Sequence, residues 1–102
     1  MRTTVLGLAA AAVTFATPAW AQQADPHLAR NLASACANCH GTGGVSQGAM
    51  PRLAGWSQAD LERSMLDYKG GRLQGTVMPQ LAKGYTDEQI TLIAGWFAAQ
   101  KP

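Results

Sequence analysis

Two cysteines and a histidine lie within one short segment, Cys36-Ala37-Asn38-Cys39-His40, and no other feature constrains the fold as strongly. On an α-helix, residues three and four apart are neighbours, with about 5–6 Å between their Cβ atoms. Both thiols and the imidazole would therefore project from one side of a helix. Two thioether bonds to a single porphyrin, with an imidazole directed at its iron, need this arrangement. The segment predicts one covalently attached haem c.

Other uses of these cysteines fit the sequence less well. A thioredoxin-like dithiol belongs to an α/β context, and this chain shows no alternating strand pattern. A structural zinc ion needs four ligands, and beside the segment only the distant His27, which we place at the surface, remains. A disulfide between Cys36 and Cys39 would leave His40 without a role.

The first residues indicate export. Met1-Arg2 is positive, Val5–Phe15 is apolar, and Ala19-Trp20-Ala21 supplies the small residues at a signal-peptidase site. The apolar run is shorter than the roughly 20 residues that span a bilayer. We predict a signal peptide over residues 1–21, cleavage after Ala21, a periplasmic location, and no membrane anchor after cleavage.

The remaining residues, 22–102, form one small domain. At about 80 residues, a core of side chains alone leaves little net stability, so a cofactor is expected to complete it. The whole chain has a net charge of +2, which includes Arg2 of the leader. Such a balance gives no strong positive field for nucleic acid and no polybasic anchor for lipid.

Helix start and stop signals predict three helices separated by two loops. Asp25-Pro26 provides a cap and a first-turn proline for the first helix. The second helix covers about Ser57–Lys69, and a capping box over Thr86–Gln89 begins the third. Gly41–Gly48, with four glycines, and Arg72–Tyr85 are predicted to be loops.

The apolar residues of each predicted helix recur with helical spacing. The predicted inner faces are Leu28, Leu32, Ala35 and Cys36 in the first helix, Leu61, Met65 and Tyr68 in the second, and Ile90, Ile93, Ala94 and Phe97 in the third. Gly95 in the last helix would allow a close crossing with the first helix. The predicted fold is all-α, with three main helices and long loops wrapped round one haem.

The second axial position of the iron needs a ligand from a remote segment. Met65 lies on an inner face, where methionine is usually core filler. Met50 is tethered too closely to His40. We predict that Met78 is the ligand, in a loop that Pro79 keeps extended. A thioether opposite imidazole raises the reduction potential and fills the site, which favours electron transfer. An open site would favour a peroxidase or a gas sensor.

The sequence leaves two interpretations open for Pro51 and two for Trp56. The carbonyl of Pro51 either accepts a hydrogen bond from the axial imidazole or belongs to an ordinary rigid turn. If the first reading holds, Leu53 packs on the haem. Trp56 either packs in the core or pairs with a haem propionate.

Taken together, these motifs resemble a class I cytochrome c. The resemblance rests on Cys36–His40, Pro51-x-Leu53-x-Gly55, Met78 and the Trp96-Phe97 pair in the last helix. It implies the small helical fold round haem, His40 and Met78 as axial ligands, and the Pro51 carbonyl on His40. Many members carry a glycine in the first helix at the crossing, where this chain has Leu28.

Two longer stretches narrow the resemblance. Cys39–Thr42 with Met50–Gly55 is similar to the cytochrome c4 and sulfide dehydrogenase group. Thr76–Met78 followed by Leu81–Thr86 is more similar to the cytochrome subunit of flavocytochrome c sulfide dehydrogenase. That resemblance implies a one-haem subunit, not catalytic by itself, which accepts electrons from a FAD-containing flavoprotein that oxidises sulfide. The alternative is a free, diffusible electron shuttle between respiratory complexes, similar to cytochromes c4 and c553.

Overall fold

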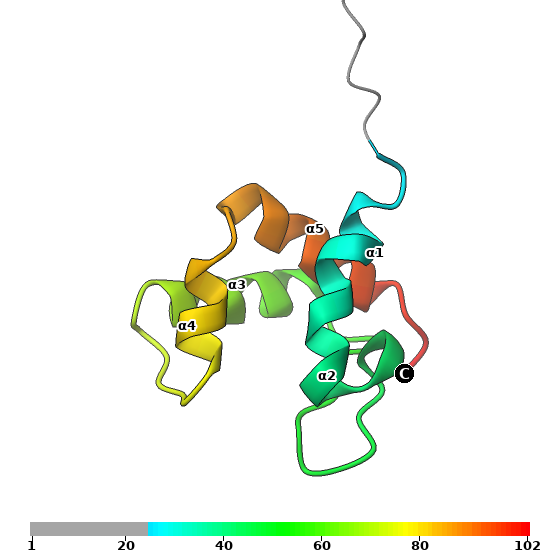
Figure 1. The fold of residues 1–102 in the computed structure, drawn as a ribbon, viewed down its shortest axis with the longest axis horizontal. Helices are drawn as coiled ribbons and strands as arrows, with labels where there is room; N and C mark the ends of the chain where they lie inside the picture. Colours follow the sequence, from blue (N-terminus) through cyan, green and yellow to red (C-terminus); the bar gives the residue numbers. More distant parts are fainter. Residues whose placement is uncertain (1–24) are drawn as a thin grey trace, which may run out of the picture.

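The computed structural model describes residues 25–102, and the predicted signal peptide and its cleavage site lie outside these residues. The described part is built from helices and turns without a strand, so the all-α prediction is confirmed. Its α-helices are α1 (Leu28–Ala33), α2 (Ala37–His40), α3 (Gln58–Lys69), α4 (Met78–Lys83) and α5 (Asp87–Ala98), shown in Figure 1. Within residues 25–102, none of these helices has the length and apolar character needed to cross a membrane.

The first helix begins later than predicted. The Asp25 carboxylate accepts a hydrogen bond from the His27 amide at 2.8 Å, and the Asp25 carbonyl accepts one from the Leu28 amide at 3.1 Å. Asp25 therefore closes a local turn instead of capping a helix, a competing use of its side chain that is common for aspartate. His27 is exposed, as predicted.

From Leu28 the chain stays helical to His40, the end of the cysteine segment. A 3₁₀ turn over Ser34–Cys36 joins α1 to α2, and the residues at the junctions keep right-handed helical backbone angles. We call Leu28–His40 the α1–α2 segment. It places the two cysteines and His40 at the C-terminal end of one helical rod.

The caps of α3 and α5 are confirmed. Ser57 Oγ accepts a hydrogen bond from the Asp60 amide at 3.1 Å. At α5 the box is reciprocal: Thr86 Oγ1 accepts from the Gln89 amide at 3.1 Å, and Gln89 Oε1 accepts from the Thr86 amide at 2.9 Å. Both signals depend on neighbours in sequence only.

The predicted loop Arg72–Tyr85 contains a helix, α4, and the expectation that Pro79 keeps the backbone extended is wrong. Pro79 lies in the first turn of α4. At that position the missing N–H would have had no helical partner, and the fixed φ of proline suits the helix. Met78 is consequently the first residue of a helix.

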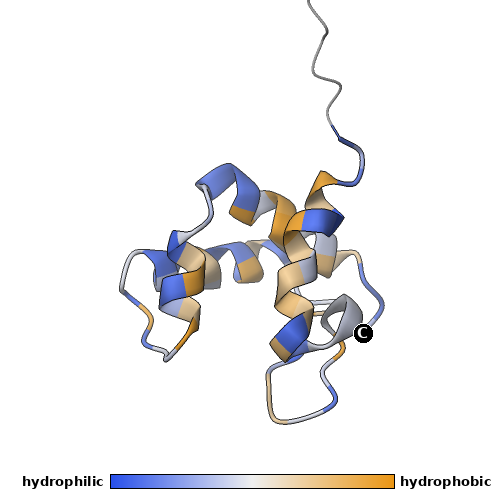
Figure 2. Cartoon of the chain, in the orientation of Figure 1, coloured by the Kyte–Doolittle hydropathy of each residue, from blue (hydrophilic) through white to orange (hydrophobic). Residues whose placement is uncertain are grey.

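The core lies where α1 crosses α5 and α5 packs on α3 (Figure 1). The predicted inner face of α5 is confirmed, with Ile90, Ile93, Ala94 and Phe97 all buried. Figure 2 shows this apolar stretch of α5 beside α1. Leu61 of α3 joins the same buried cluster.

The predicted inner face of the first helix is partly wrong. Leu28 is 41% exposed, whereas Ala35 and Cys36 line a cavity between the helices. Ala33, which the pattern missed, is 1% exposed and packs in the cluster that contains Ala94. Small side chains on both helices thus allow a close approach, and Leu28 does not obstruct it.

Gly95 does not serve that crossing. A Cβ added at Gly95 would lie 3.1 Å from Nε2 of Gln58, the first residue of α3. The predicted reason for this glycine is therefore wrong, and its neighbour is α3. Gln58 Nε2 also donates to the Thr91 carbonyl at 3.3 Å, and an ion pair of 2.7 Å joins Lys69 to Asp87. These contacts fasten α3 along α5.

Candidate functional site

A cavity of about 600 Å³ lies beside the core, and its lining is mainly apolar. The α1–α2 segment and α4 contribute to it from different parts of the chain. In Figure 1 these two segments stand apart from each other, in front of α3 and α5. Side chains from α3 and α5, including Leu61 and Phe97, complete the lining. The volume lies within the range of cofactor sites.

All six residues that sequence analysis assigned to the site line this one cavity. They are Cys36, Cys39, His40, Pro51, Leu53 and Met78. The fold therefore brings together groups that are up to 42 positions apart in the chain. Met65 and Tyr68, predicted only as the inner face of the second helix, line it too.

Cys36 and Cys39 are both free thiols, Cys36 partly buried and Cys39 exposed. Burial raises the pKa of the Cys36 thiol above its ordinary value. A backbone hydrogen bond opposes this in part, and the nearby charge of Cys39 adds a smaller upward shift of the pKa. A dithiol that exchanges disulfides needs a lowered thiol pKa. The environment of Cys36 therefore does not suit thioredoxin-like chemistry.

His40 is 7% exposed, and among residues 25–102 it is the one buried polar side chain. Its Nδ1 donates a hydrogen bond to the Pro51 carbonyl oxygen at 2.7 Å. This contact sets the tautomer and the ring orientation, and it leaves Nε2 as the nitrogen free to bind a metal. Of the two readings of Pro51, the structure shows the hydrogen-bonded one.

Two glycines shape the backbone that makes this contact possible. Gly41 ends α2 directly after His40, with φ of 83° and ψ of 162°. The carbonyl of Gly44 accepts hydrogen bonds from the amides of Leu53 at 2.9 Å and Ala54 at 3.2 Å. The Pro51–Leu53 strip is thereby held against the end of α2, and its carbonyl faces His40.

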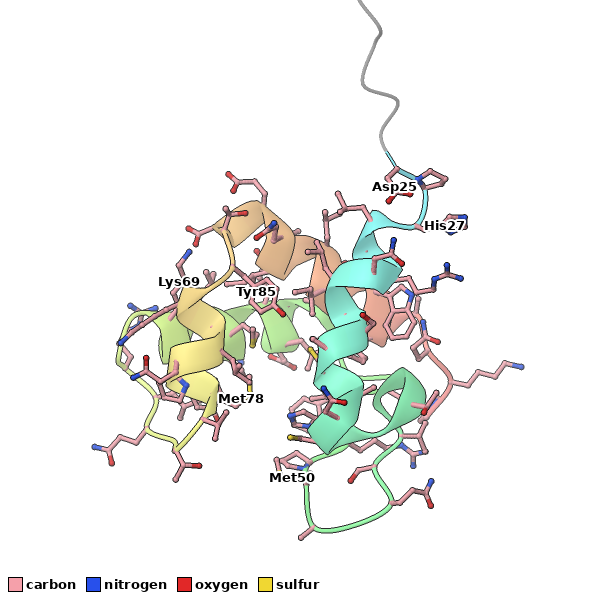
Figure 3. The ribbon with its side chains drawn as sticks, in the orientation of Figure 1. Asp25, His27, Met50, Lys69, Met78 and Tyr85 are labelled. Carbon is pink, nitrogen blue, oxygen red and sulfur yellow. The ribbon has the colours of Figure 1, made fainter. Side chains whose placement is uncertain are left out.

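The three methionines of the described part, Met50, Met65 and Met78, all line the cavity. Met50 precedes Pro51, whose carbonyl is bonded to His40, so Met50 is anchored on the His40 side. Figure 3 shows Met50 beside α2 and Met78 on the inner side of α4, across from it. Met65 lies on α3. Met78 is thus the methionine across the cavity from the His40 side.

Sequence reasoning missed three polar residues of the cavity: Arg52, Ser64 and Thr76. For Arg52 a signal was present, since it stands between Pro51 and Leu53, which were both assigned to the site. Tyr85 also lines the cavity. Burial raises the pKa of its phenol, and the charge of Cys36 contributes less.

Comparisons with known proteins show the family of this chain. The model of the family described as "Cytochrome C oxidase, cbb3-type, subunit III" matches residues 18–97. The chain belongs to this cytochrome c family. The resemblance to class I cytochromes c is confirmed, and with it the cofactor, a covalently bound haem c with its iron.

Three relatives of this cytochrome illustrate the match. The chain is 46% identical over 66 residues to the cytochrome subunit of sulfide dehydrogenase from Chlorobaculum tepidum, which covers 65% of this chain and 60% of that protein. It is 33% identical over 85 residues to the thiosulfate dehydrogenase electron acceptor of Thiomonas intermedia (81% and 39%). It is 36% identical over 70 residues to cytochrome c-554(548) of Halomonas halodenitrificans (65% and 84%). The chain thus spans less than two thirds of the first two proteins.

The residues of the cavity fit a haem. Two thiols and one imidazole stand within five residues at the cavity, the His40 ring is oriented by its second nitrogen, and a thioether is available on the opposite side. The apolar lining suits a porphyrin. The chain is a class I cytochrome c and acts in electron transfer.

Proposed function

We propose that Cys36 and Cys39 hold the haem through thioether bonds, with His40 and Met78 as axial ligands of the iron. The observation that carries this proposal is the single cavity with the cysteines and His40 on one side and Met78 of α4 on the other. Leu53 supplies part of the apolar lining against which the porphyrin packs.

The bound haem supplies an iron that alternates between ferric and ferrous states. The side chains of the protein would set the balance between these two oxidation states. A Met78 thioether bound to the iron would favour the ferrous state, and the hydrogen bond from His40 Nδ1 to Pro51 would hold the imidazole in position to bind it. If His40 and Met78 both bind the iron, oxygen and peroxide would have no vacant site, and the protein would transfer electrons without substrate chemistry.

The electron donor we propose is a FAD-containing flavoprotein that oxidises sulfide. The support is the 46% identity to a cytochrome subunit of sulfide dehydrogenase, together with the Leu81–Thr86 stretch. We further propose that residues 1–21 are a signal peptide cleaved after Ala21, which places the cytochrome in the periplasm, without a membrane anchor after cleavage. Residues 22–102 then form the one-haem domain.

A free carrier is the second candidate, and one observation favours it. The chain is also similar to a thiosulfate dehydrogenase electron acceptor and to cytochrome c-554(548), of which it covers 84%. A free carrier would accept electrons from one redox protein and deliver them to another without a lasting complex.

Purification under mild conditions separates the two candidates. For a subunit, we expect haem absorbance and FAD fluorescence to elute together in size-exclusion chromatography of a native periplasmic extract. Haem eluting alone at monomer size, at the same protein concentration and ionic strength, would establish the free carrier.

Carbon monoxide tests the axial ligands separately. We expect the visible spectrum of the ferrous protein at neutral pH to stay unchanged under carbon monoxide, because Met78 occupies the sixth position. Rapid formation of a carbonyl spectrum would contradict the assignment of Met78 and favour a peroxidase or gas sensor.

A further inference from the structure

Arg52 is the one residue with a permanent charge among those that line the haem cavity. The other titratable side chains of the lining are the two thiols, His40, Tyr68 and Tyr85, and the lining contains no carboxylate. Within residues 25–102, the cations of the three ion pairs are Arg63, Lys69 and Arg72, and the guanidinium of Arg52 makes no hydrogen bond. An arginine without an internal partner therefore stands at the edge of the site.

The backbone on both sides of Arg52 is fixed by contacts that serve the same site. The preceding Pro51 carbonyl accepts the His40 hydrogen bond at 2.7 Å, and the following Leu53 amide donates to the Gly44 carbonyl at 2.9 Å. Ala54, one residue further, is 2% exposed. The stem of Arg52 thus starts from an anchored strip, although its side chain is exposed.

A haem brings negative charge into this cavity, since each haem carries two propionate carboxylates. Thioether bonds at Cys36 and Cys39 fix the porphyrin in the cavity, so the propionates can meet only groups placed at its edge. A carboxylate moved from water into a mainly apolar cavity is costly unless it is paired. The guanidinium fork of arginine matches a carboxylate with two parallel hydrogen bonds.

We propose that Arg52 binds a propionate of the haem and thereby raises the reduction potential. An unpaired propionate places a negative charge near the iron and stabilises the ferric state. A guanidinium paired with it cancels much of that charge. The inference rests on the proposed haem attachment and is independent of which protein donates the electrons.

The test compares three haem-loaded variants with the wild type. R52Q removes the cation, R52K keeps the charge without the planar fork, and R30Q is the matched control. Arg30 is an exposed arginine of α1 that lies outside the lining of the haem cavity. All four proteins are assembled with haem-ligation machinery, and their midpoint potentials are measured at one pH and one ionic strength.

We expect R52Q to shift the ferric–ferrous equilibrium about three- to tenfold toward ferric, where tenfold corresponds to 59 mV for one electron. R52K should retain most of the wild-type potential, and R30Q should change the equilibrium less than about twofold. As a second readout, the propionate bending band in the resonance Raman spectrum should move in R52Q and stay in place in R30Q.

Two results would overturn the pairing. One is a propionate band and a potential in haem-loaded R52Q that equal those of the wild type. The other is an equal fall in potential for R52Q and R30Q with an unmoved band, which reports only the loss of one protein charge. A wild-type chain without covalent haem would contradict the proposed attachment as well, so the two failures are distinguishable.

Discussion

His40 shows how a single side chain depends on backbone from a remote loop. Its ring is buried, and its Nδ1 is satisfied by the carbonyl of Pro51, eleven residues away. A buried imidazole without that partner would lose orientation and would leave a polar atom unpaired. The loop between them is therefore part of the site as much as the cysteine segment is.

Replacing Met78 tests the axial position directly. In Met78→Ala we expect a lower reduction potential and rapid carbon monoxide binding by the ferrous protein, because the sixth position becomes open. Met65→Ala is the matched control, since Met65 lines the same cavity from α3. It should keep the six-coordinate spectrum. Carbon monoxide binding by Met65→Ala, with none by Met78→Ala, would reverse the assignment.

Gly41 is the position next to His40 that a side chain cannot occupy. Its φ of 83° with ψ of 162° falls in a region populated essentially by glycine, and an added Cβ would lie 2.1 Å from the Val45 carbonyl oxygen. Gly41→Ala should lower the free energy of unfolding of the haem protein by about 3 kcal/mol. Urea titration followed by circular dichroism measures this value.

Gly48→Ala is the control for that measurement. Gly48 lies in the same loop, and an added Cβ there meets nothing within 4 Å. Its free energy of unfolding should stay within about 0.5 kcal/mol of the wild type. Equal effects of the two substitutions would show that the loop does not depend on the conformation of Gly41.

At the scale of elements, α4 differs most from expectation. Within the described residues it is the helix that the sequence did not predict, and it carries Met78 at its first position. Because Pro79 follows at once, the helix cannot extend backwards through Met78 with a full set of hydrogen bonds. Met78 therefore stays at the helix start, on the side that faces the cavity.

The capping box of α5 offers a test of helix stability away from the haem. Thr86→Ala removes the acceptor for the Gln89 amide and should lower the free energy of unfolding by about 1 kcal/mol. Thr86→Ser keeps the hydroxyl and should behave like the wild type. If both variants lose the same stability, measured by urea unfolding, the methyl group and its packing would matter more than the cap.

For the molecule as a whole, the buried core is small. Its main cluster consists of two alanines with Leu61, Ile93 and Phe97, and the haem cavity adjoins it. Leu61, Ile93 and Phe97 line that cavity, so a bound porphyrin would extend the core directly. The cofactor would thus add buried apolar contacts that the side chains alone do not provide.

A haem-free form tests this dependence. In the double variant Cys36→Ser, Cys39→Ser no thioether can form, and we expect a colourless chain with less than about 3 kcal/mol of stability and reduced helical circular dichroism. Wild-type protein made without haem-ligation machinery should match it. A colourless chain that unfolds as cooperatively as the haem protein would show that the side-chain core suffices.

Signals between close neighbours in sequence determined much of this protein. The sequence predicted the N-cap of α3, the capping box of α5, the apolar face of α5 and the Cys36–His40 segment. Each of these features involves residues that are only a few positions apart. Asp25 shows the limit of such signals, since its side chain could close a turn or cap a helix, and the structure has the turn.

Only the tertiary structure decided which distant groups meet. It placed Ala33 instead of Leu28 at the crossing with α5, set Gly95 against Gln58, and arranged three methionines round one cavity with Met78 across from the His40 side. The same packing placed Arg52 in the lining of the haem cavity, where it is the one residue with a permanent charge. Such contacts depend on how helices from separate parts of the chain bury their surfaces together, and no local pattern records that choice.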